Sequence, residues 1–284
     1  MQARAEFAEH RCRLCGGDSA VYLSRPDFSI RRCNVCSVMW CDPLRFDASF
    51  NPDNEDAYLE VDDAIAAENA SRVTFTQQHA PASSHPRMVE IGCMHGDFVQ
   101  KARAAGYDAL GLDLSQTAVD HAAAHRPGMV RYGTLDADQP DASLDVVTAF
   151  NVVEHMEDPG AFLDDVHRVL RPGGWFVAET PAQESLYHFV FMARGFLQPS
   201  RPKLEVGMHP GTHIFKFGRR AWRNVLLRRG FDAPTIEPKS TPLRELLAKN
   251  KAAPLLFRGG IVGVGALARV TGLGNRVLVA ARRR

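Results

Sequence analysis

The stretch that decides the fold runs from Val89 to Phe98 and reads VEIGCMHGDF. Its apolar start predicts a buried strand, and its polar end predicts the first turn of a helix. Between them, Gly92 and Gly96 allow the backbone to approach a ligand, because neither residue carries a Cβ atom. A strand, a glycine turn and a helix in this order indicate a ligand site at the carboxyl end of the strand.

The composition of this turn argues against two phosphate-binding loops. A dinucleotide fingerprint that starts at Gly92 needs glycines where this chain has Met94 and Asp97. A P-loop needs a Gly-Lys-Ser or Gly-Lys-Thr ending, which the turn lacks. The turn is also acidic, with Glu90 before it and Asp97 after it. It therefore favours a ligand with a cationic group over a pyrophosphate.

The chain on both sides of the turn alternates predicted strands and helices. The predicted strands are 88–91, 109–112, 129–132, 144–150, 175–179, 235–237 and 277–281. The predicted helices are 56–78, 98–105, 115–125, 161–170, 183–196, 219–229, 243–248 and 255–267. Short apolar strands separated by helices call for a mostly parallel sheet that is covered on both faces. The fold class is therefore α/β.

A second carboxylate, Asp113, follows the second of these strands. In Rossmann-type sites an acidic residue about 20 residues after the glycine turn accepts hydrogen bonds from ribose hydroxyls. Carboxylates at successive strand ends of one sheet normally flank a ligand crevice. A simpler role, in which Glu90 and Asp113 only cap helices, stays open.

An ordered set of motifs between Arg87 and Glu179 resembles the class I S-adenosylmethionine-dependent methyltransferases. The set comprises the glycine turn with Glu90, the strand-ending Asp113, SLDVV at 143–147, NVVEHMEDP at 151–159 and LRPGG at 170–174. The chain departs from the family at Met94, where a second glycine is usual, and at Leu144, where an aromatic residue is usual. The resemblance implies a Rossmann-like seven-stranded sheet and a methyltransferase that uses S-adenosylmethionine (SAM).

The resemblance also implies which residues bind the cofactor. They are Glu90, Gly92, Gly96, Asp113, Leu114, Leu135, Phe150 and Asn151. The first three would surround the methionine part of SAM, Asp113 would hold the ribose and Leu114 would lie against the adenine. Leu135 follows the third strand, where members of the family contact the adenine amino group. The backbone of Phe150 and Asn151 would contact the amino end of the cofactor.

Two histidines are candidates for a catalytic base. Transfer of a methyl group to oxygen or carbon benefits from a base with a pKa near neutrality, usually histidine. His155 follows the fourth strand, at the edge of the sheet where the acceptor should lie, although it could instead support the cofactor loop through hydrogen bonds. His213 lies in an insertion at about 181–217 that we expect to form a lid, and a base role and a packing role both stay open for it.

Four cysteines near the N-terminus form two C-x-x-C pairs, Cys12 with Cys15 and Cys33 with Cys36. Four thiolates at this spacing suit tetrahedral Zn²⁺ and resemble a zinc ribbon, with short strands predicted at 20–23 and 28–31. We expect residues 1–45 to form this module and residues 46–284 to form the methyltransferase domain. A closed Cys₄ site leaves no position for water, so a structural Zn²⁺ is expected and a catalytic Zn²⁺ is the alternative. Cys41 is expected to be a spare buried thiol.

The charge of the chain bears on the acceptor. Its 284 residues include 34 basic and 33 acidic side chains, a net charge of +1, which disfavours RNA as a partner. Zinc ribbons joined to this kind of core resemble methyltransferases of nucleotide-linked sugars, glycans and small metabolites, and also those of ribosomal RNA. We expect a small-molecule or glycan acceptor, methylated on oxygen or carbon. A ribosomal RNA methyltransferase and a non-catalytic SAM-binding protein stay open.

The charge is unevenly distributed along the chain. From Lys239 to Arg284 ten basic residues face the single acid Glu245, which gives +9 there and −8 over the rest. This basic region could contact an anionic acceptor or the surface of a membrane. No segment approaches the roughly 18 apolar residues of a membrane span, and the N-terminus lacks an apolar secretory signal. With paired cysteines suited to metal, these features predict a cytoplasmic location.

Overall fold

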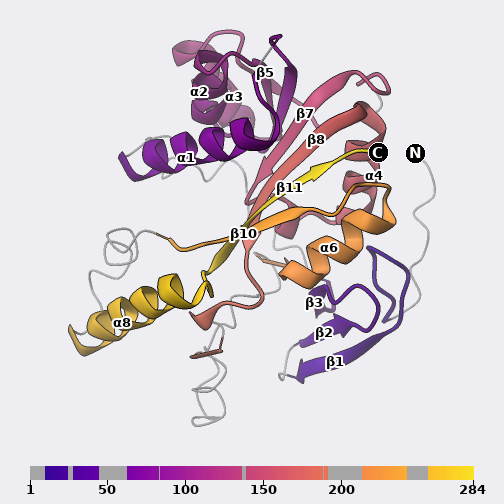
Figure 1. The fold of residues 1–284 in the computed structure, drawn as a ribbon, viewed down its shortest axis with the longest axis vertical. Helices are drawn as coiled ribbons and strands as arrows, with labels where there is room; N and C mark the ends of the chain where they lie inside the picture. The colour runs from indigo at the N-terminus through magenta and orange to yellow at the C-terminus, as the bar shows by residue number, and fades with distance from the viewer. Residues whose placement is uncertain are drawn as a thin grey trace.

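A computed structural model describes residues 10–24, 28–44, 63–82, 84–135, 139–187, 189–190, 213–241 and 255–284. Its central element is a seven-stranded sheet with the order β10-β11-β8-β7-β4-β5-β6 (Figure 1). The strands are β4 (Arg87–Ile91), β5 (Asp108–Asp113), β6 (Val130–Tyr132), β7 (Leu144–Phe150), β8 (Leu170–Pro181), β10 (Thr235–Lys239) and β11 (Arg276–Arg282). Only β11 runs antiparallel to its neighbours, so the predicted mostly parallel, seven-stranded α/β sheet is confirmed.

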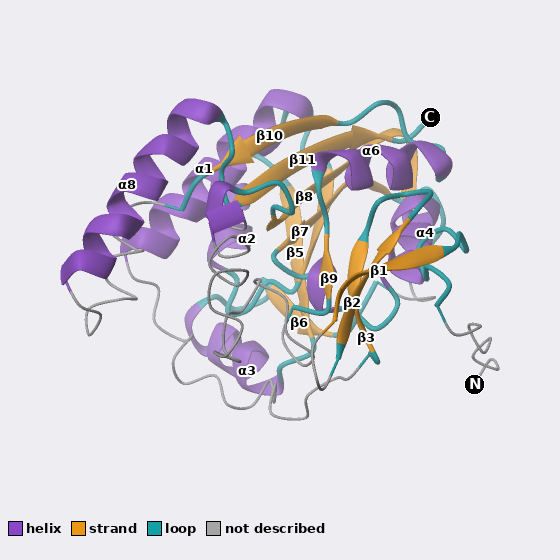
Figure 2. Ribbon diagram, turned by 90° about the horizontal axis from the view of Figure 1, so that it is seen from below, coloured by secondary structure: helices purple, strands orange, loops and turns teal. Residues whose placement is uncertain are grey.

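Helices cover both faces of this sheet (Figures 1 and 2). They are α1 (Asp63–His79), α2 (Asp97–Ala104), α3 (Gln116–His125), α4 (Pro159–Val169), α6 (Arg219–Arg228) and α8 (Leu255–Thr271), with a 3₁₀ turn η2 (Val153–His155). Neighbouring side chains of a strand point to opposite faces. Accordingly, Val146 shares an apolar cluster with α1 and α2, whereas Val147 shares the other cluster with α4 and α6.

Local sequence signals account for where two of these helices begin. The Ser115 hydroxyl accepts a hydrogen bond from the amide of Ala118 at 3.1 Å, which makes it the predicted N-cap of α3. In α4, the carboxylate of Asp158 accepts from the amide of Ala161 at 2.9 Å, and Pro159 occupies the first turn, where its missing N–H costs nothing.

A second, smaller sheet has the order β1-β2-β3-β9 and is called the small sheet below. It consists of β1 (Ser19–Ser24), β2 (Ser29–Cys33), β3 (Met39–Asp42) and β9 (Phe215–Lys216). The two strands predicted between the cysteine pairs are present, and β3 and the two-residue β9 were not predicted. The small sheet lies beside α4 and α6 (Figure 2). Cys12, which precedes the small sheet, and Trp40 of β3 share one apolar cluster with Trp222 of α6 and Phe176 of β8, so the N-terminal module packs into the core of the larger sheet.

Parts of several predictions fall on residues that the structure does not describe. These are the start of the helix at 56–78, half of the helix at 183–196, the helix at 243–248 and residues 191–212 of the expected lid. Of the helices in the described ranges, none is long and apolar enough to cross a membrane.

The basic C-terminal region is partly used to hold the fold together. Arg282 and Arg284 donate to the backbone carbonyls of Gly173 and Phe231, at 3.2 and 2.8 Å. Arg283 donates to the carbonyl of Leu170. These contacts tie the end of β11 and the residues after it to the start of β8 and to the loop after α6, so part of the excess positive charge has a structural use.

Candidate active site

The glycine turn between β4 and α2 has the tight path that its sequence predicts. Gly92 has a φ of 66°, and a Cβ atom there would lie 2.4 Å from a methyl carbon of Val152, so a side chain cannot be accommodated. Gly96, the N-cap of α2, has a φ of 82°. Met94 also lies in the left-handed region, with a φ of 51°. The methionine thus takes a conformation that suits glycine, at a cost of roughly 1–2 kcal/mol.

Asp113 ties this turn to the turn that follows β5. One carboxylate oxygen accepts from the amide of Met94 at 2.7 Å, and the other accepts from the amide of Ser115 at 2.9 Å. Each carboxylate oxygen can accept about two hydrogen bonds. Asp113 therefore keeps acceptor capacity for hydroxyl groups while it fixes both turns at the carboxyl edge of the sheet.

Glu90 lies at the end of β4 with only 5% of its surface exposed. Its Oε2 atom has no hydrogen-bond partner among the described residues. Burial raises the pKa of this carboxyl well above its ordinary value, against the opposing effect of Arg72. A buried carboxylate oxygen that lacks a donor fits a ligand that brings one, and the ammonium group of SAM is such a donor. The residues present therefore fit the cofactor that the sequence predicts.

The other predicted cofactor residues differ in exposure. Leu114 is 56% exposed and directly follows Asp113, whereas Leu135 and Phe150 are buried. Phe150 packs edge-on against Phe98 of α2, with ring centroids 4.8 Å apart. Asn151 has a φ of 57°, and its amide donates to the carbonyl of Glu179 at 2.8 Å. The structure thus brings the ends of β4, β5 and β7 together at one edge, and the individual cofactor contacts stay predictions.

The two candidate bases lie together with a third residue, Glu154. The rings of His155 and His213 are 4.8 Å apart between centroids, and the His155 Nε2 atom lies 3.9 Å from a carboxylate oxygen of Glu154. Burial raises the pKa of Glu154 to about 8. Burial, with smaller effects from His155 and Lys216, lowers the pKa of His213 to about 4. His213 is therefore neutral at pH 7 and holds a captured proton poorly.

A buried ion network next to this edge was missed by sequence reasoning. Glu179 has no exposed surface, and its carboxylate contacts Arg72 at 3.1 Å, Lys239 at 2.8 Å and Arg276 at 3.1 Å. Glu68 of α1 joins the same three cations. The partners of Glu179 are between 60 and 107 residues away in sequence, so no local pattern signals them.

Helix α1 also reaches the glycine turn. Its Asn69 donates to the carboxylate of Asp97 at 2.8 Å, and its Arg72 lies over the ring of Phe150, 4.9 Å from the centroid. Asp97, expected as an acid facing a ligand, is buried and also contacts Lys101 at 2.8 Å. Its charge is therefore balanced within the protein.

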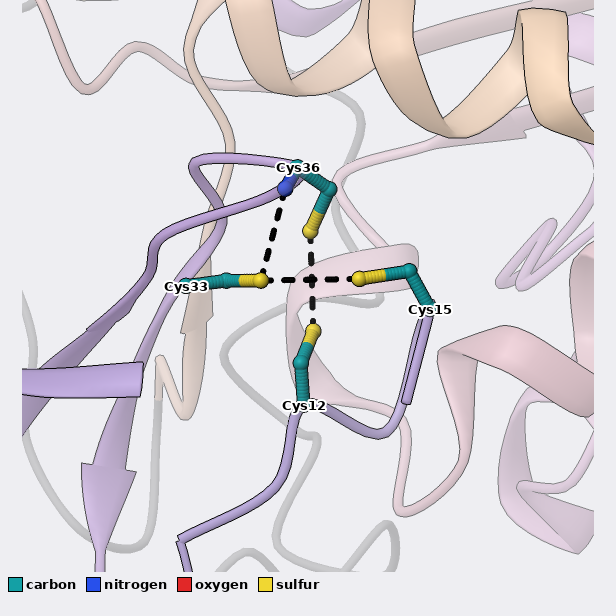
Figure 3. Close-up of side chains that lie close together, drawn as sticks. All are labelled: Cys12, Cys15, Cys33 and Cys36. Atoms are coloured by element: carbon teal, nitrogen blue, oxygen red, sulfur yellow. Dashed lines mark hydrogen bonds between the residues drawn. The ribbon is translucent and has the colours of Figure 1, made fainter. Parts of the chain in front are cut away.

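The four cysteines of the two pairs point toward one centre (Figure 3). Their sulfur atoms all lie within 4.8 Å of one another, with Cys12 and Cys36 3.5 Å apart and Cys15 and Cys33 also 3.5 Å apart. The amide of Cys36 donates to the sulfur of Cys33 at 3.3 Å. The hydrogen bond from Cys36 lowers the pKa of Cys12 to about 6 although burial opposes it. This donor set is compatible with Zn²⁺.

Cys41 lies outside the cluster of four, in β3. It is fully buried, and burial raises the pKa of its thiol to about 12. It is therefore the spare buried thiol that the sequence predicts.

The strand order, the glycine turn and the paired carboxylates define the class I SAM-dependent methyltransferases. Residues 60–235, well over half of the chain, match the family model described as a methyltransferase domain, and the chain belongs to this family.

Named relatives agree with this family. The chain is 38% identical over 96 residues to a protein of Mycolicibacterium smegmatis named "Probable S-adenosylmethionine-dependent methyltransferase", covering 33% of this chain and 37% of that protein. It is 33% identical over 117 residues to the ubiquinone biosynthesis O-methyltransferase of Methylococcus capsulatus, covering 39% of this chain and 49% of that enzyme. The chain thus spans less than half the length of these two relatives.

Solved structures agree on the fold. A SAM-dependent methyltransferase from Archaeoglobus fulgidus superposes with a TM-score of 0.54 at 18% identity, covering 81% of this chain and 98% of the other. At this identity the likeness concerns the fold alone.

Proposed function

We propose that this chain transfers a methyl group from SAM to an oxygen or carbon atom of a small-molecule acceptor. The observation that carries the proposal is the edge where three features meet: a Glu90 Oε2 atom with no hydrogen-bond partner among the described residues, the hydrogen-bonding Asp113 and the sterically closed turn at Gly92. SAM, when bound, supplies the electrophilic methyl group on its sulfonium. The acidic lining favours this cation and repels pyrophosphate.

The residues of the edge would divide the binding of the cofactor. Glu90 would accept from the ammonium group of SAM, and Asp113 would accept from the ribose hydroxyls. Leu114, half-exposed beside Asp113, would cover the adenine, with Leu135 beyond it. The backbone of Phe150 and Asn151 would contact the amino end of the cofactor. The remaining work of the protein is to align the acceptor for in-line attack.

His155 would take the proton of an acceptor hydroxyl. It follows β7 at the carboxyl edge and lies beside Glu154, whose carboxylate would stabilise the imidazolium. His213 is the weaker base of the pair, because its lowered pKa leaves little affinity for a proton. We assign it a positioning role against the ring of His155.

The acceptor class rests on two independent features. The relative from Methylococcus capsulatus is named as an O-methyltransferase of ubiquinone biosynthesis, which is a small-molecule pathway. The net charge of +1 disfavours RNA as the acceptor. A glycan or nucleotide-sugar acceptor is the finer form of this proposal, since Arg269 adds positive charge to the last turn of α8. A cytoplasmic location fits a module built on reduced cysteines.

We further propose that Cys12, Cys15, Cys33 and Cys36 bind one structural Zn²⁺. All four positions of a tetrahedral ion would be filled, so the ion would stabilise the small sheet and take no part in the reaction.

Transfer of labelled methyl groups tests the proposed function. The chain is incubated with methyl-tritiated SAM and a cell extract, which is then separated into small-molecule, lipid-linked glycan and RNA fractions. We expect label in the small-molecule or glycan fraction. Label in RNA alone would contradict the proposed acceptor class. SAM binding without labelled product in any fraction would contradict the proposal that the chain catalyses methyl transfer.

A further inference from the structure

A compact group of three ligand-type side chains lies outside the cysteine cluster and the cofactor edge. Glu154, His155 and His213 each offer one ligand atom, and these atoms all lie within 4.8 Å of one another. Two of the residues come from the 3₁₀ turn after β7, and the third precedes β9. Two segments that lie about 60 residues apart in sequence therefore bring these three side chains together.

Glu154 gives the independent sign that a ligand belongs there. Its side chain is fully buried, and neither carboxylate oxygen has a hydrogen-bond partner on the other residues that the structure describes. A buried carboxylate with no partner costs several kcal/mol, and native proteins rarely keep one. One carboxylate oxygen of Glu154 lies within 4.8 Å of a ring nitrogen of each histidine, so a cation placed among the three side chains would give the carboxylate a partner.

We propose that Glu154, His155 and His213 bind one divalent transition-metal cation. Two imidazole nitrogens and one carboxylate oxygen are a donor set typical of catalytic Zn²⁺ and of non-haem Fe²⁺ or Mn²⁺ sites. Metal–ligand bonds of about 2.0–2.2 Å place two ligand atoms of a tetrahedral ion roughly 3.4 Å apart. The present spacing therefore needs only small side-chain movements to close around an ion.

The site differs in kind from the cysteine cluster. Three protein ligands leave at least one coordination position open, whereas four thiolates leave none. Resting on the proposed function, the open position would take the oxygen of the acceptor, and the bound cation would lower the pKa of that hydroxyl. With the cation bound, the hydroxyl proton would leave to water, because the His155 nitrogen is then a metal ligand; without the cation, His155 takes the proton itself.

The donor atoms set the selectivity of the site. A hard cation such as Mg²⁺ prefers oxygen ligands and would gain little from two imidazoles. The donor set therefore favours Mn²⁺, Fe²⁺ or Zn²⁺.

Binding of Mn²⁺ to the full-length chain tests the proposal without reference to activity. The protein is first treated with a mild chelator, and metal analysis verifies that one Zn²⁺ per chain remains. Mn²⁺ is then titrated, and the free ion is followed by electron paramagnetic resonance, because Mn²⁺ favours oxygen and nitrogen donors over the thiolates. We expect one Mn²⁺ per chain, with affinity at least tenfold lower in Glu154→Gln and in His213→Ala.

The control is His125→Ala, which removes an exposed imidazole of α3 and should leave Mn²⁺ affinity unchanged. If His213→Ala fails to fold, the nearly isosteric Glu154→Gln decides the outcome. Absence of saturable Mn²⁺ binding, or equal binding by wild type and Glu154→Gln, would overturn the site. A chain that transfers methyl groups without binding Mn²⁺ loses only this inference, and one that binds Mn²⁺ without transferring methyl groups loses only the proposed function.

Discussion

The amide of Ile214 donates a hydrogen bond to the carbonyl oxygen of Glu154 at 3.1 Å. The carbonyl of Ile214 in turn accepts from the amide of Cys41 in β3, also at 3.1 Å. One residue thus joins the small sheet to the 3₁₀ turn that carries Glu154 and His155. Because His213 precedes Ile214 in the chain, the position of its ring depends on the same link. The cysteine module is therefore mechanically connected to the edge of the sheet where the acceptor is expected.

This link predicts what loss of the cysteine site does. Cys33→Ser should lower zinc content and the unfolding temperature together, because metal binding stabilises the folded module. Methyl transfer should fall by more than the affinity for SAM, since β3 holds Ile214 whereas Glu90 and Asp113 lie on other strands. Metal analysis, thermal unfolding and SAM titration measure the three quantities.

Cys41→Ala is the matched control for that variant. It removes a buried thiol of the same sheet that lies outside the metal cluster, so zinc content should be retained. A well-folded, zinc-free and inactive Cys33→Ser protein would show that the metal acts directly in the reaction.

Asp113→Asn should weaken SAM binding at least tenfold. The substitution keeps the shape but removes the charge and turns one acceptor oxygen into a donor, which then faces the amide of Met94 or Ser115. Two charge-assisted hydrogen bonds that fix the turns are lost or weakened, each worth about 1.5–3 kcal/mol. Calorimetric titration with SAM measures the change. Asp108→Asn, at the exposed start of β5, should bind like wild type, and equal affinity of both variants would contradict the assignment.

The parts of the fold that could be read from the sequence are those with local signals. A pattern of a few consecutive residues predicts the strand at 144–150, the N-cap Ser115 and the turn at Gly92. All three are present in the structure. Met94 follows the path of a glycine because Asp113 holds its amide, so a departure from the family motif did not change the turn.

The parts that could not be read depend on contacts distant in sequence. The two-residue strand β9 has no periodicity of its own, and it forms because it pairs with Met39 and Trp40. The sequence suggests that Lys239 and Arg276 belong to a basic surface, but both form ion pairs with the buried Glu179. In the sequence Glu154 stands out only as part of the motif at 151–159. Its burial and its closeness to His213 depend on the folded structure.

Glu154→Gln should raise the stability of the metal-free protein. At pH 9, above the raised pKa of about 8, the wild-type carboxylate is charged and buried without a hydrogen-bond partner among the described residues, and removing such a charge relieves a penalty of about 1–3 kcal/mol. We expect a higher urea midpoint with an unchanged slope, combined with reduced methyl transfer. Glu157→Gln, three residues along, serves as the comparison, and its free energy of unfolding should stay within about 0.5 kcal/mol of the wild-type value. A lower midpoint for Glu154→Gln would indicate that the carboxylate has a stabilising role in the apo fold.

Glu179→Gln should destabilise the protein by about 3–5 kcal/mol, because it leaves Arg72, Lys239 and Arg276 buried with only Glu68 to balance them.

Burial alone would raise the pKa of Glu179, but the three cations outweigh it and hold the pKa below the ordinary value of 4.5. A carboxyl with a lowered folded-state pKa stabilises the protein fully above its unfolded-state pKa, and this contribution is lost as pH falls through the folded-state value. Wild type should therefore lose stability below about pH 4.5 more steeply than Glu179→Gln, as measured by urea unfolding from pH 7 to pH 3. Glu237→Gln, on the exposed side of β10, is the control and should follow the wild-type pH profile. Parallel profiles for wild type and Glu179→Gln would mean that the network contributes no net stability.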